Sequence, residues 1–468
     1  MKILMVSNLY PPYYVGGYEL RCALIAEGLH QRGHDVKVLT SRFGLPSGPL
    51  QENIRGVQVD RVLSQYHIAP QRRVEWPLLL SMKYLKPKRP IVHQTLEAFI
   101  RVRPQLQDVR RFIRAMDEFK PDIINWWSIG GLTKAILSVP KLKRIPDMFC
   151  VEDDWVIEEQ SLGGPSERPP WAALWRKEEP RHWPRFVIRL MKNWKAGLLK
   201  EGIVTSHVPF CPTHVCFVSE FLRADYEAAG LRFPSSEVIY GGVPADKFYF
   251  TRRAPADDRD PIWFLYAGQI TRDRGLHTVI EALDALSLET RSLVTLTVVG
   301  DSFDGRYMQE VHDQVRARHL SEKVVFLGQK SYDQMPQIYR SHDLLIAPSL
   351  RKEGLPLSMV EAMLSGCAVV TTGSGGAMEI AGLANLPLFR KGDAVALAQV
   401  LQRLISDRRQ LQRIAREGQE VALREFSSDR MIDRLCATFE NVCEQNKRIP
   451  DSPIMPDYIE ASIAAERV

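Results

Sequence analysis

The sequence lacks the features that mark membrane-spanning and secreted proteins. In 468 residues, no apolar run approaches the roughly 18 residues that a bilayer-spanning helix needs. The N-terminal stretch MKILMVSNLYPP has an apolar run of only about five residues and no small-residue cleavage site, so we expect a first β-strand there and not a signal peptide. These absences favour a cytoplasmic protein.

Paired cysteines are missing as well. The seven cysteines are an odd number, and none stands at the paired spacing of a zinc site. Cys211 and Cys216 come nearest to such a pair, but no second pair of His or Cys follows them. We therefore expect free thiols in a reducing compartment, with no bound metal and no cofactor. The P-loop of ATPases is also absent.

Positive charge is concentrated in one segment. The chain carries a net charge of +6, and residues 168–200 contain nine basic and two acidic residues, which is +7. Five of the nine tryptophans lie between Trp155 and Trp194. Basic and aromatic residues together are typical of a membrane interface, so residues of about 155–200 predict a peripheral membrane contact. An insertion that packs its tryptophans on the first domain is the open alternative. No nucleic-acid motif accompanies the charge, so we expect no nucleic-acid partner.

Strand and helix patterns alternate through the first half of the chain. Ile3–Val6 and Val36–Leu39 are typical of buried strands, and between them apolar residues from Cys22 to Leu29 recur on one helical face. Further strands are expected at 123–124, 148–151 and 215–218. This alternation predicts a parallel sheet covered by helices.

The alternation restarts after a polar, breaker-rich stretch at 251–261, which we interpret as a linker. A last helix is expected after Phe426, and a loosely ordered tail from 447 onward. Strands are expected at 263–267, 293–299, 324–327, 344–347 and 368–371, and a helix at 278–286.

Two carboxylates eight residues apart, Glu353 and Glu361, bracket the stretch EGLPLSMVE. It follows an expected strand, and Pro356 suits the first position of a helix. Ser358 and Glu361 have capping-box spacing, and Gly366 suits the helix end. Because a helix N-terminus attracts phosphate, two adjacent carboxylates could hold sugar hydroxyls beside it. Taken alone, however, the pair is equally explained by a helix cap and a solvated loop acid.

Several motifs occur in an order that resembles the retaining glycosyltransferases of family 4, which have the GT-B fold. The matching stretches cover most of the chain: NLYPPYYVGGYELRCALIAEGLHQRGHDVKVLT, FVSEFLRADYEAAGL, VIYGGVPADKF, YAGQITRDRG, the block from FLGQKSYDQMP to GSGGAMEI, and FSSDRM. The resemblance implies an α/β fold of two Rossmann-like domains facing across a cleft, with a C-terminal helix crossing back to the first domain. The implied parts are an acceptor-side domain at 1–250, a nucleotide-sugar domain at 251–427, the crossover helix at 428–446 and the tail at 447–468.

The resemblance also implies roles for single residues. Glu353 would face the donor sugar and Arg274 would neutralise the leaving phosphate, so these two are the candidate catalytic residues. Glu361 would hold the ribose. The implied donor-binding set is Gly16, Gly17, Gln269, Arg274, Gly354, Leu355, Leu357 and Glu361. The donor would be a nucleotide-sugar, UDP- or GDP-linked, and the family's role in polysaccharide biosynthesis implies a glycan, lipid-linked or small-molecule hydroxyl acceptor, with no metal.

Departures from the family pattern fall on the sugar and acceptor side. Asn125-Trp126-Trp127 stands where relatives often show histidines, and Glu152-Asp153 replaces a frequent His-Asp pair. Asn125, Trp127, Glu152 and Asp153 are therefore the candidate residues on that side. Gln269 stands where many relatives carry arginine. These changes leave open a weak or inactive nucleotide- or glycan-binding protein and, further off, a nucleotide-sugar epimerase.

Overall fold

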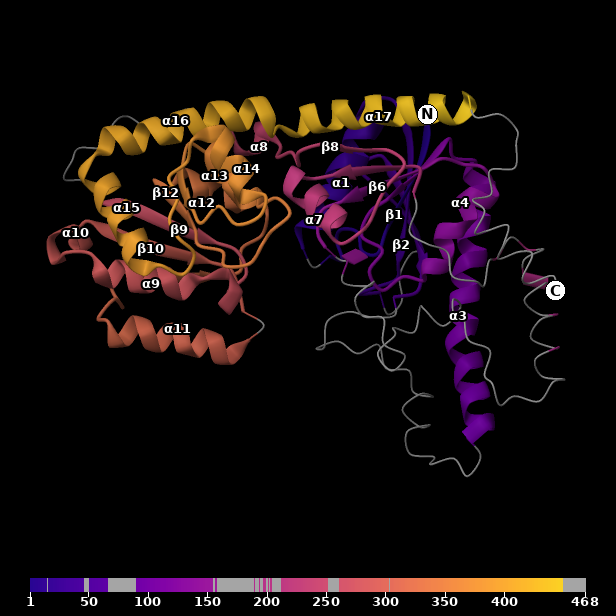
Figure 1. Ribbon diagram of the computed structural model, residues 1–468, viewed down its shortest axis with the longest axis horizontal. Coiled ribbons are helices and arrows are strands. Elements are labelled where there is room, and N and C mark those ends of the chain that lie inside the picture. Colours follow the sequence, from indigo (N-terminus) through magenta and orange to yellow (C-terminus); the bar gives the residue numbers. More distant parts are fainter. Residues whose placement is uncertain are drawn as a thin grey trace. The chain divides into compact units, whose positions relative to one another are not determined.

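A computed structural model gives the fold of most of the chain (Figure 1). The structure describes residues 1–14, 16–45, 50–65, 90–154, 156–157, 189, 193, 197–198, 201, 203, 212–250, 261–302 and 304–448, without the side chains of 90–104 and 448. The five tryptophans of the basic segment, the linker at 251–260 and the tail beyond 448 lie outside the described residues. The predicted membrane contact falls there too.

The chain forms two compact units. The first unit comprises Met1–Cys216, Leu231–Glu237 and Leu435–Val468, and the second comprises Phe217–Gly230 and Val238–Arg434. The long last helix α17 (Ser428–Arg448) therefore begins in the second unit and ends in the first, as the crossover-helix prediction requires. The sequence predicted one boundary near 250, whereas this division is discontinuous.

The first unit is built on an eight-stranded sheet with the order β3-β4-β2-β1-β5-β6-β7-β8. Pairing is parallel from β4 through β2, β1 and β5 to β6, and β3 joins β4 antiparallel. The strands are β1 (Lys2–Ser7), β2 (Asp35–Ser41), β3 (Gln51–Ile54), β4 (Val57–Leu63), β5 (Ile123–Trp126), β6 (Asp147–Val151), β7 (His214–Phe217) and β8 (Ser236–Val238). Every predicted strand is present, but β3, β4 and β8 were missed. The strands β3 and β8 are short and lie at the two edges, and β4 has seven residues and pairs with the edge strand β3.

Helices connect these strands. The predicted helix between the first two strands is α1 (Gly17–Gln31), which buries Cys22, Ile25, Ala26 and Leu29 as its apolar period requires. The others are α3 (Pro90–Phe119), η1 (Lys134–Ser138), α4 (Val139–Leu142) and α7 (Glu220–Ala228), the last grouped with the second unit.

The second unit is built on a five-stranded parallel sheet with the order β11-β10-β9-β12-β13. Each strand was predicted from its apolar run: β9 (Ile262–Ala267), β10 (Val294–Val299), β11 (Val324–Gly328), β12 (Leu344–Ala347) and β13 (Ala368–Thr371). The strand order reverses between β9 and β12. In such sheets, ligands bind outside the carboxyl ends of the strands at this reversal.

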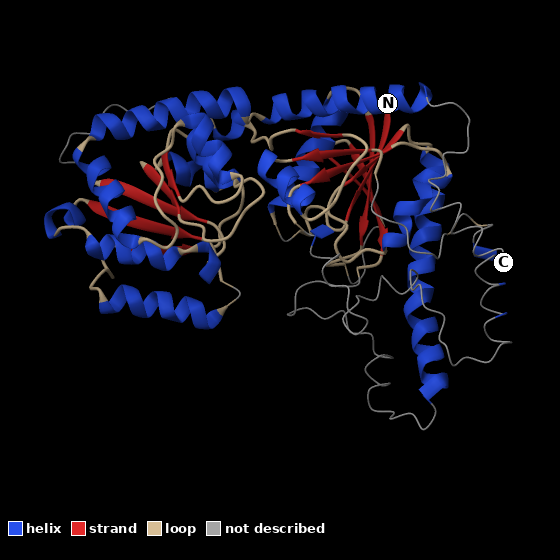
Figure 2. Ribbon diagram, in the orientation of Figure 1, coloured by secondary structure: helices blue, strands red, loops and turns tan. Residues whose placement is uncertain are grey.

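Helices lie on both faces of this second sheet (Figure 2). Among them, α9 contacts α11 and α15, while α16 contacts α13 and α14. Their bounds are α8 (Ala245–Phe248), η3 (Arg272–Arg274), α9 (Leu276–Ala285), α10 (Leu288–Ser292), α11 (Gly305–Ala317), α12 (Met335–Arg340), α13 (Leu357–Leu364), α14 (Ala377–Ala384), α15 (Ala394–Ser406) and α16 (Arg408–Glu425).

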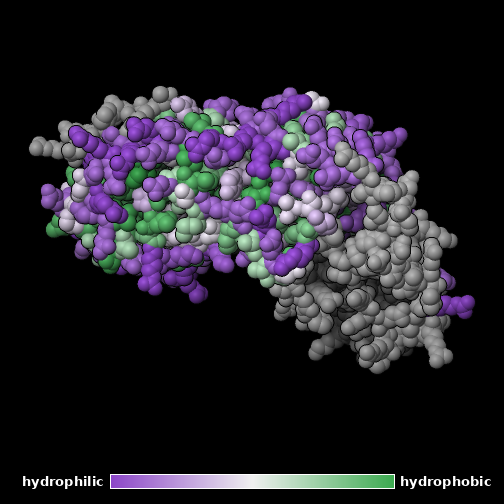
Figure 3. Space-filling model, turned by 45° about the horizontal axis from the view of Figure 1, so that its top comes forward, coloured by the Kyte–Doolittle hydropathy of each residue, from purple (hydrophilic) through white to green (hydrophobic). Residues whose placement is uncertain are grey.

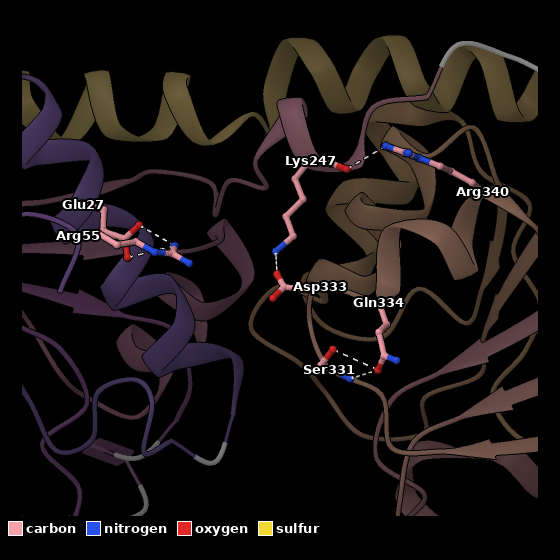
Figure 4. A network of polar contacts seen from close by, with 7 residues as sticks. All are labelled: Glu27, Arg55, Lys247, Ser331, Asp333, Gln334 and Arg340. Carbon is pink, nitrogen blue, oxygen red and sulfur yellow. Dashed lines mark hydrogen bonds and ion pairs between the residues drawn. The ribbon is translucent and has the colours of Figure 1, made fainter.

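Polar contacts anchor α12 against α8 (Figure 4). Arg340 donates to the carbonyls of Lys247 and Tyr249 at 3.0 and 3.2 Å, and the Lys247 ammonium pairs with Asp333. The turn before α12 is closed by Ser331, whose N–H and hydroxyl both donate to Gln334. These contacts fix the helix that carries Tyr339.

The face shown in Figure 3 is mostly hydrophilic, with smaller apolar areas between the polar ones. Among the described helices, none combines the length and the apolar character needed to cross a bilayer.

A fully buried arginine holds the loop after β1. Arg61 on β4 donates to the carbonyls of Tyr10 and Pro11 at 3.0 and 2.5 Å, pairs with Glu52 and lies over the ring of Tyr13. Its side chain is 1 % exposed. A buried guanidinium needs most of its N–H donors to be hydrogen-bonded. The hydrogen bonds that offset the cost of burying this charge therefore also hold the loop in place.

Replacing Arg61 with Met should therefore destabilise the fold. The change leaves two carbonyls without their donor, and we expect a loss of about 3 kcal/mol in the free energy of unfolding, measured by urea denaturation. Arg55→Met is the matched control, because Arg55 is 76 % exposed where it pairs with Glu27 (Figure 4). That pair should contribute less than about 1 kcal/mol. Equal losses in the two variants would contradict the role given to Arg61.

Candidate active site

The two predicted catalytic residues meet at the strand-order reversal of the second unit. Arg274 follows β9 and Glu353 follows β12, and these neighbouring strands pair at Leu344 with Phe264 and at Leu345 with Leu265. One guanidinium nitrogen of Arg274 lies 2.5 Å from a carboxylate oxygen of Glu353, with the side chains 27 % and 15 % exposed. The Nε of Arg274 is buried, and no hydrogen-bond partner for it lies in the described part of the chain.

Backbone contacts place Arg274 in this position. Gly275 directly after it has a φ of +75°, and a Cβ there would lie 2.3 Å from the carbonyl oxygen of Pro348. The carbonyl of Asp273 accepts hydrogen bonds from the N–H groups of Leu350 and Arg351 at 2.8 and 3.2 Å. The loops after β9 and β12 are therefore joined through their main chains.

A second close backbone contact holds the Glu353 loop from the side of β13. The N–H of Gly376 donates to the carbonyl of Glu353 at 2.8 Å, and a Cβ on Gly376 would lie 1.9 Å from the carbonyl oxygen of Gly354. The Ser374 hydroxyl donates to the carbonyl of Arg351 at 2.6 Å. Only residues without a side chain allow this approach, so the glycines at 375 and 376 fix where the Glu353 carboxylate lies.

Glu361 lies inside α13 and is buried, with 9 % of its surface exposed. Its carboxylate accepts a hydrogen bond of 2.9 Å from the hydroxyl of Tyr339 on α12. Burial first, and then the charge of Glu361, raise the pKa of Tyr339 well above its usual range, so the tyrosine stays protonated and remains a donor. No pattern in the sequence indicated this role for Tyr339.

The capping-box prediction for this helix is wrong. The N-cap is Pro356, which has no side-chain cap, and Ser358 and Glu361 both lie within the helix. Glu361 is the fifth residue of the helix, and its carboxylate is bound by Tyr339 and not by the helix N-terminus. The helix begins at Leu357, one residue after the start that Pro356 predicted. Gly366 has the left-handed φ of +75° expected after a helix end. The N–H groups of Leu357 and Ser358 belong to the first turn, which has no intrahelical acceptor for them.

The other donor-side candidates in this unit lie nearby in the same loops. Gln269 is exposed, and its carbonyl accepts a hydrogen bond of 2.7 Å from the buried Tyr266 hydroxyl. Leu355 is buried at 8 %, and Gly354 precedes it in the loop held by Gly376.

In the first unit, Gly16 and Gly17 start α1 after β1. The N–H of Gly16 donates to the Glu19 carboxylate at 2.9 Å. A Cβ on Gly17 would meet nothing within 4 Å, and one on Gly16 would make an ordinary contact of 3.6 Å with Glu19. The described residues around Gly16 and Gly17 would therefore accommodate a Cβ, and the donor-binding role of these glycines stays a prediction.

Asn125 and Trp127 lie at the carboxyl end of β5, where the strand order of the first sheet reverses between β1 and β5. Both are buried, with 0 % and 1 % of their surface exposed. The Trp127 indole donates to Asn125 at 2.5 Å, and the Asn125 amide donates to the Met148 carbonyl at 3.2 Å. Tyr18 crosses the Trp127 ring edge-on at 5.8 Å and donates to the Cys150 carbonyl at 2.6 Å. This geometry favours a supporting layer, and direct contact of Asn125 and Trp127 with a sugar stays a prediction.

Glu152, after β6, forms an ion pair of 3.0 Å with Arg21 on α1, and the two side chains are 10 % and 6 % exposed. Burial raises the pKa of Glu152 to about 8 against the opposing effect of Arg21, while the charges of Asp153 and Glu19 raise it further. A carboxyl with a pKa near neutral can hold or release a proton, which suits a site that handles hydroxyl groups.

Comparison with known proteins agrees with this geometry. The sequence profile described as Glycosyltransferase Family 4 matches residues 15–247, and that of Glycosyl transferases group 1 matches residues 249–421. The chain belongs to glycosyltransferase family 4. It is 26% identical over 397 residues to an uncharacterized glycosyltransferase of Methanocaldococcus jannaschii, covering 81% of this chain and 82% of the relative. It is 28% identical to the lipopolysaccharide 1,2-N-acetylglucosaminetransferase of Salmonella typhimurium, covering 53% of this chain and 68% of that enzyme.

Solved structures of this family share the fold. HepE of Anabaena, crystallised with UDP and glucose, has a TM-score of 0.59 and 21% identity, covering 94% of this chain and 100% of that one. Sucrose-phosphate synthase of Thermosynechococcus elongatus has a TM-score of 0.64 and 17% identity, covering 94% and 98%. The GT-B prediction is therefore confirmed at the level of fold.

Thus the second unit of this family 4 protein brings Arg274 and Glu353 together, and Glu361 is joined to Tyr339. Sequence reasoning missed Tyr339, Gly376 and Arg21, although the first two lie in the quoted signature block. The sequence showed only that Tyr339 and Gly376 lie in the block from FLGQKSYDQMP to GSGGAMEI. Their roles depend on contacts with other elements of the fold, which sequence spacing does not reveal. The roles of the predicted site residues remain predictions.

A methyl group on Gly376 should damage the site. Gly376→Ala would force the Glu353 loop away from Arg274, and we expect at least a tenfold loss of nucleotide affinity by calorimetry. Gly382→Ala is the control, because a Cβ there meets nothing within 4 Å on the same helix α14. That change should leave affinity intact and stabilise the helix by about 0.5 to 1 kcal/mol. Unchanged affinity in Gly376→Ala would contradict the role of the glycine contact.

The raised pKa of Glu152 predicts a pH dependence of stability. Because its pKa is higher in the folded state, the folded protein holds the proton more tightly, and this stabilisation is complete below the usual pKa of 4.5 and is lost as pH rises toward about 8. Relative to Glu152→Gln, the native protein should therefore lose stability between pH 5 and pH 8, by more than about 1 kcal/mol. If the free energy of unfolding, measured by urea denaturation, changes with pH in the same way in the native protein and in Glu152→Gln, the raised pKa of Glu152 is contradicted.

Proposed function

We propose that this family 4 glycosyltransferase transfers a sugar, with retention of configuration, from a UDP- or GDP-linked donor to a hydroxyl of a glycan, lipid-linked or small-molecule acceptor. The observation that carries the proposal is the Arg274–Glu353 pair at the strand-order reversal of the second unit. The crystal structures of HepE with UDP and with UDP-glucose support a nucleotide-sugar donor by analogy.

Arg274 would act on the leaving group. As the bond between the sugar and the diphosphate breaks, negative charge grows on the phosphate, and a fixed guanidinium stabilises that charge more than it stabilises the intact donor. The buried Nε of Arg274, which has no partner in the described residues, supplies a donor for a phosphate oxygen. The first-turn N–H groups of α13 would bind the same diphosphate.

The two carboxylates would divide the rest of the donor between them. Glu353 orients Arg274 and has oxygens that can accept from sugar hydroxyls. Glu361 would accept from the ribose hydroxyls, held in place by Tyr339. Because Tyr339 stays protonated, it keeps the carboxylate fixed as an acceptor.

The proposed transfer needs no protein nucleophile. The bond from the anomeric carbon to the phosphate oxygen breaks, the acceptor oxygen bonds to that carbon on the same face, and the acceptor proton moves to the phosphate oxygen. The supporting charge is that of Arg274, so we propose that this step uses no metal.

Glu152 and Asp153, after β6, are the proposed acceptor-side residues of the first unit. The segment at 155–200 is proposed to contact the membrane peripherally from the cytoplasmic side.

A donor screen tests the proposal. UDP-, GDP- and ADP-sugars are incubated with the protein and an extract of polysaccharide and lipid-linked acceptors, and nucleotide release is measured. We expect release with one UDP- or GDP-sugar and at least about a 100-fold lower kcat in Glu353→Gln, because the change loosens Arg274 and removes a hydroxyl acceptor.

Glu322→Gln is the control for this variant, since Glu322 is exposed in a turn of the same unit. It should keep full activity. Nucleotide binding without release from any donor would instead favour a nucleotide-binding protein that has lost catalysis, and a new sugar isomer formed without acceptor would favour an epimerase.

A further inference from the structure

Three side chains that could bind a metal converge in the first unit, on β7 and β8. His214 and Cys216 stand two apart on β7, so their side chains point to the same face of the sheet. Glu237 comes from the neighbouring strand β8. One donor atom from each, an imidazole nitrogen, a thiol sulfur and a carboxylate oxygen, lies within 4.8 Å of the other two.

One distance in the cluster matches the separation of two ligand atoms around a metal ion. The Nε2 of His214 lies 3.4 Å from a carboxylate oxygen of Glu237, and although this nitrogen is buried, it makes no hydrogen bond within the described part of the chain. Metal bonds of about 2.0 to 2.3 Å at tetrahedral angles would separate two ligand atoms by roughly 3.3 to 3.6 Å. The observed spacing therefore matches an edge of such a site.

Neighbouring groups fix these ligands in the orientation that a metal requires. The Nδ1 of His214 lies 2.9 Å from the hydroxyl of Ser235, and when Nδ1 carries the proton and donates to this hydroxyl, the lone pair of the ring is on Nε2. The Thr438 hydroxyl on α17 donates to the Glu237 carboxylate at 2.6 Å. Metal-binding imidazoles and carboxylates in proteins have partners of this kind.

Exposure leaves a route into the cluster. Cys216 is 4 % exposed and the His214 side chain 9 %, whereas the Glu237 side chain is 31 % exposed. An ion could therefore enter past Glu237 and bind against the two buried ligands. A mixed nitrogen, sulfur and oxygen set of three favours a zinc-like ion, with water in the fourth position.

The geometry points to a zinc-binding site formed by His214, Cys216 and Glu237. Binding joins β7 to β8 directly, and through Thr438 it ties both strands to the last helix α17. The Cys216 thiol gives its proton to solvent when its sulfur bonds the ion. The role is structural, because the proposed transfer step depends on residues after β9 and β12 of the other unit.

Metal titration of the full chain tests this site without reference to activity, so its outcome is separate from that of the proposed function. The protein is purified without a polyhistidine tag, stripped with a chelator and titrated with Zn²⁺ against a chromophoric competitor. We expect one ion per chain with a Kd of micromolar or tighter. Co²⁺ should give the absorption of a thiolate-to-metal charge transfer.

Substitutions identify the ligands. Cys216→Ser and His214→Gln should weaken Zn²⁺ binding at least about 100-fold, and Thr438→Val roughly tenfold, since it removes only a supporting hydrogen bond. Cys443→Ser is the matched control, because Cys443 is another buried cysteine of the same unit outside the cluster. Zn²⁺ should raise the Tm of the native protein and of Cys443→Ser, and not that of Cys216→Ser.

Two results would overturn the site. The first is that the native protein binds no Zn²⁺ at Zn²⁺ concentrations below about 100 μM. His214 and Glu237 would then only contact each other, without a metal ion. The second is Zn²⁺ binding that persists unchanged in His214→Gln. If Cys216→Ser does not fold by circular dichroism, the Co²⁺ spectrum of the native protein decides whether a thiolate binds the ion.

Discussion

The candidate site depends on backbone contacts that only glycine permits. The loops after β9, β12 and β13 meet at the carboxyl edge of the second sheet, where Gly275 approaches Pro348 and Gly376 approaches Gly354. A Cβ at either position would overlap a carbonyl oxygen. These contacts replace side-chain packing by main-chain packing, so the loops that carry Arg274 and Glu353 have little freedom. The catalytic role proposed for this pair would need that rigidity, because its contribution depends on charges that are already in place when the reaction begins.

Local patterns in the sequence were enough to predict every strand of the second sheet and five of the eight strands of the first. Every strand of the second unit coincides with an apolar run, since a parallel strand covered on both faces must be apolar along its length. The hairpin of β3 and β4 was missed because it lies at the sheet edge, where half of β3 is exposed. The capping-box prediction failed for a related reason, because Ser358 and Glu361 satisfy a local spacing, but the carboxylate is bound by Tyr339 from another helix. Local spacing cannot show which element will lie opposite.

In the first unit, buried polar groups form a layer beside the carboxyl ends of β5 and β6. Asn125, Trp127 and Tyr18 satisfy one another and the carbonyls of β6, so the carboxyl ends of β5 and β6 rest on a hydrogen-bonded layer. The sequence positions of Asn125 and Trp127 pointed to a sugar, and the burial of both side chains favours a supporting role. The proposed zinc site could not be predicted from the sequence, since Glu237 reaches His214 and Cys216 only because β8 lies beside β7.

Arginine at position 274 has a consequence that lysine would not have. Its guanidinium can contact Glu353 through one nitrogen and keep other donors, including the buried Nε, for a phosphate. In the ligand-free protein the carboxylate balances the charge of Arg274, so the residue is held in place before the donor arrives. If the proposed diphosphate donor binds here, the guanidinium can contact both anions because its N–H donors point in fixed and different directions. A lysine ammonium is a single point charge, and a nearby carboxylate would compete with the phosphate for it.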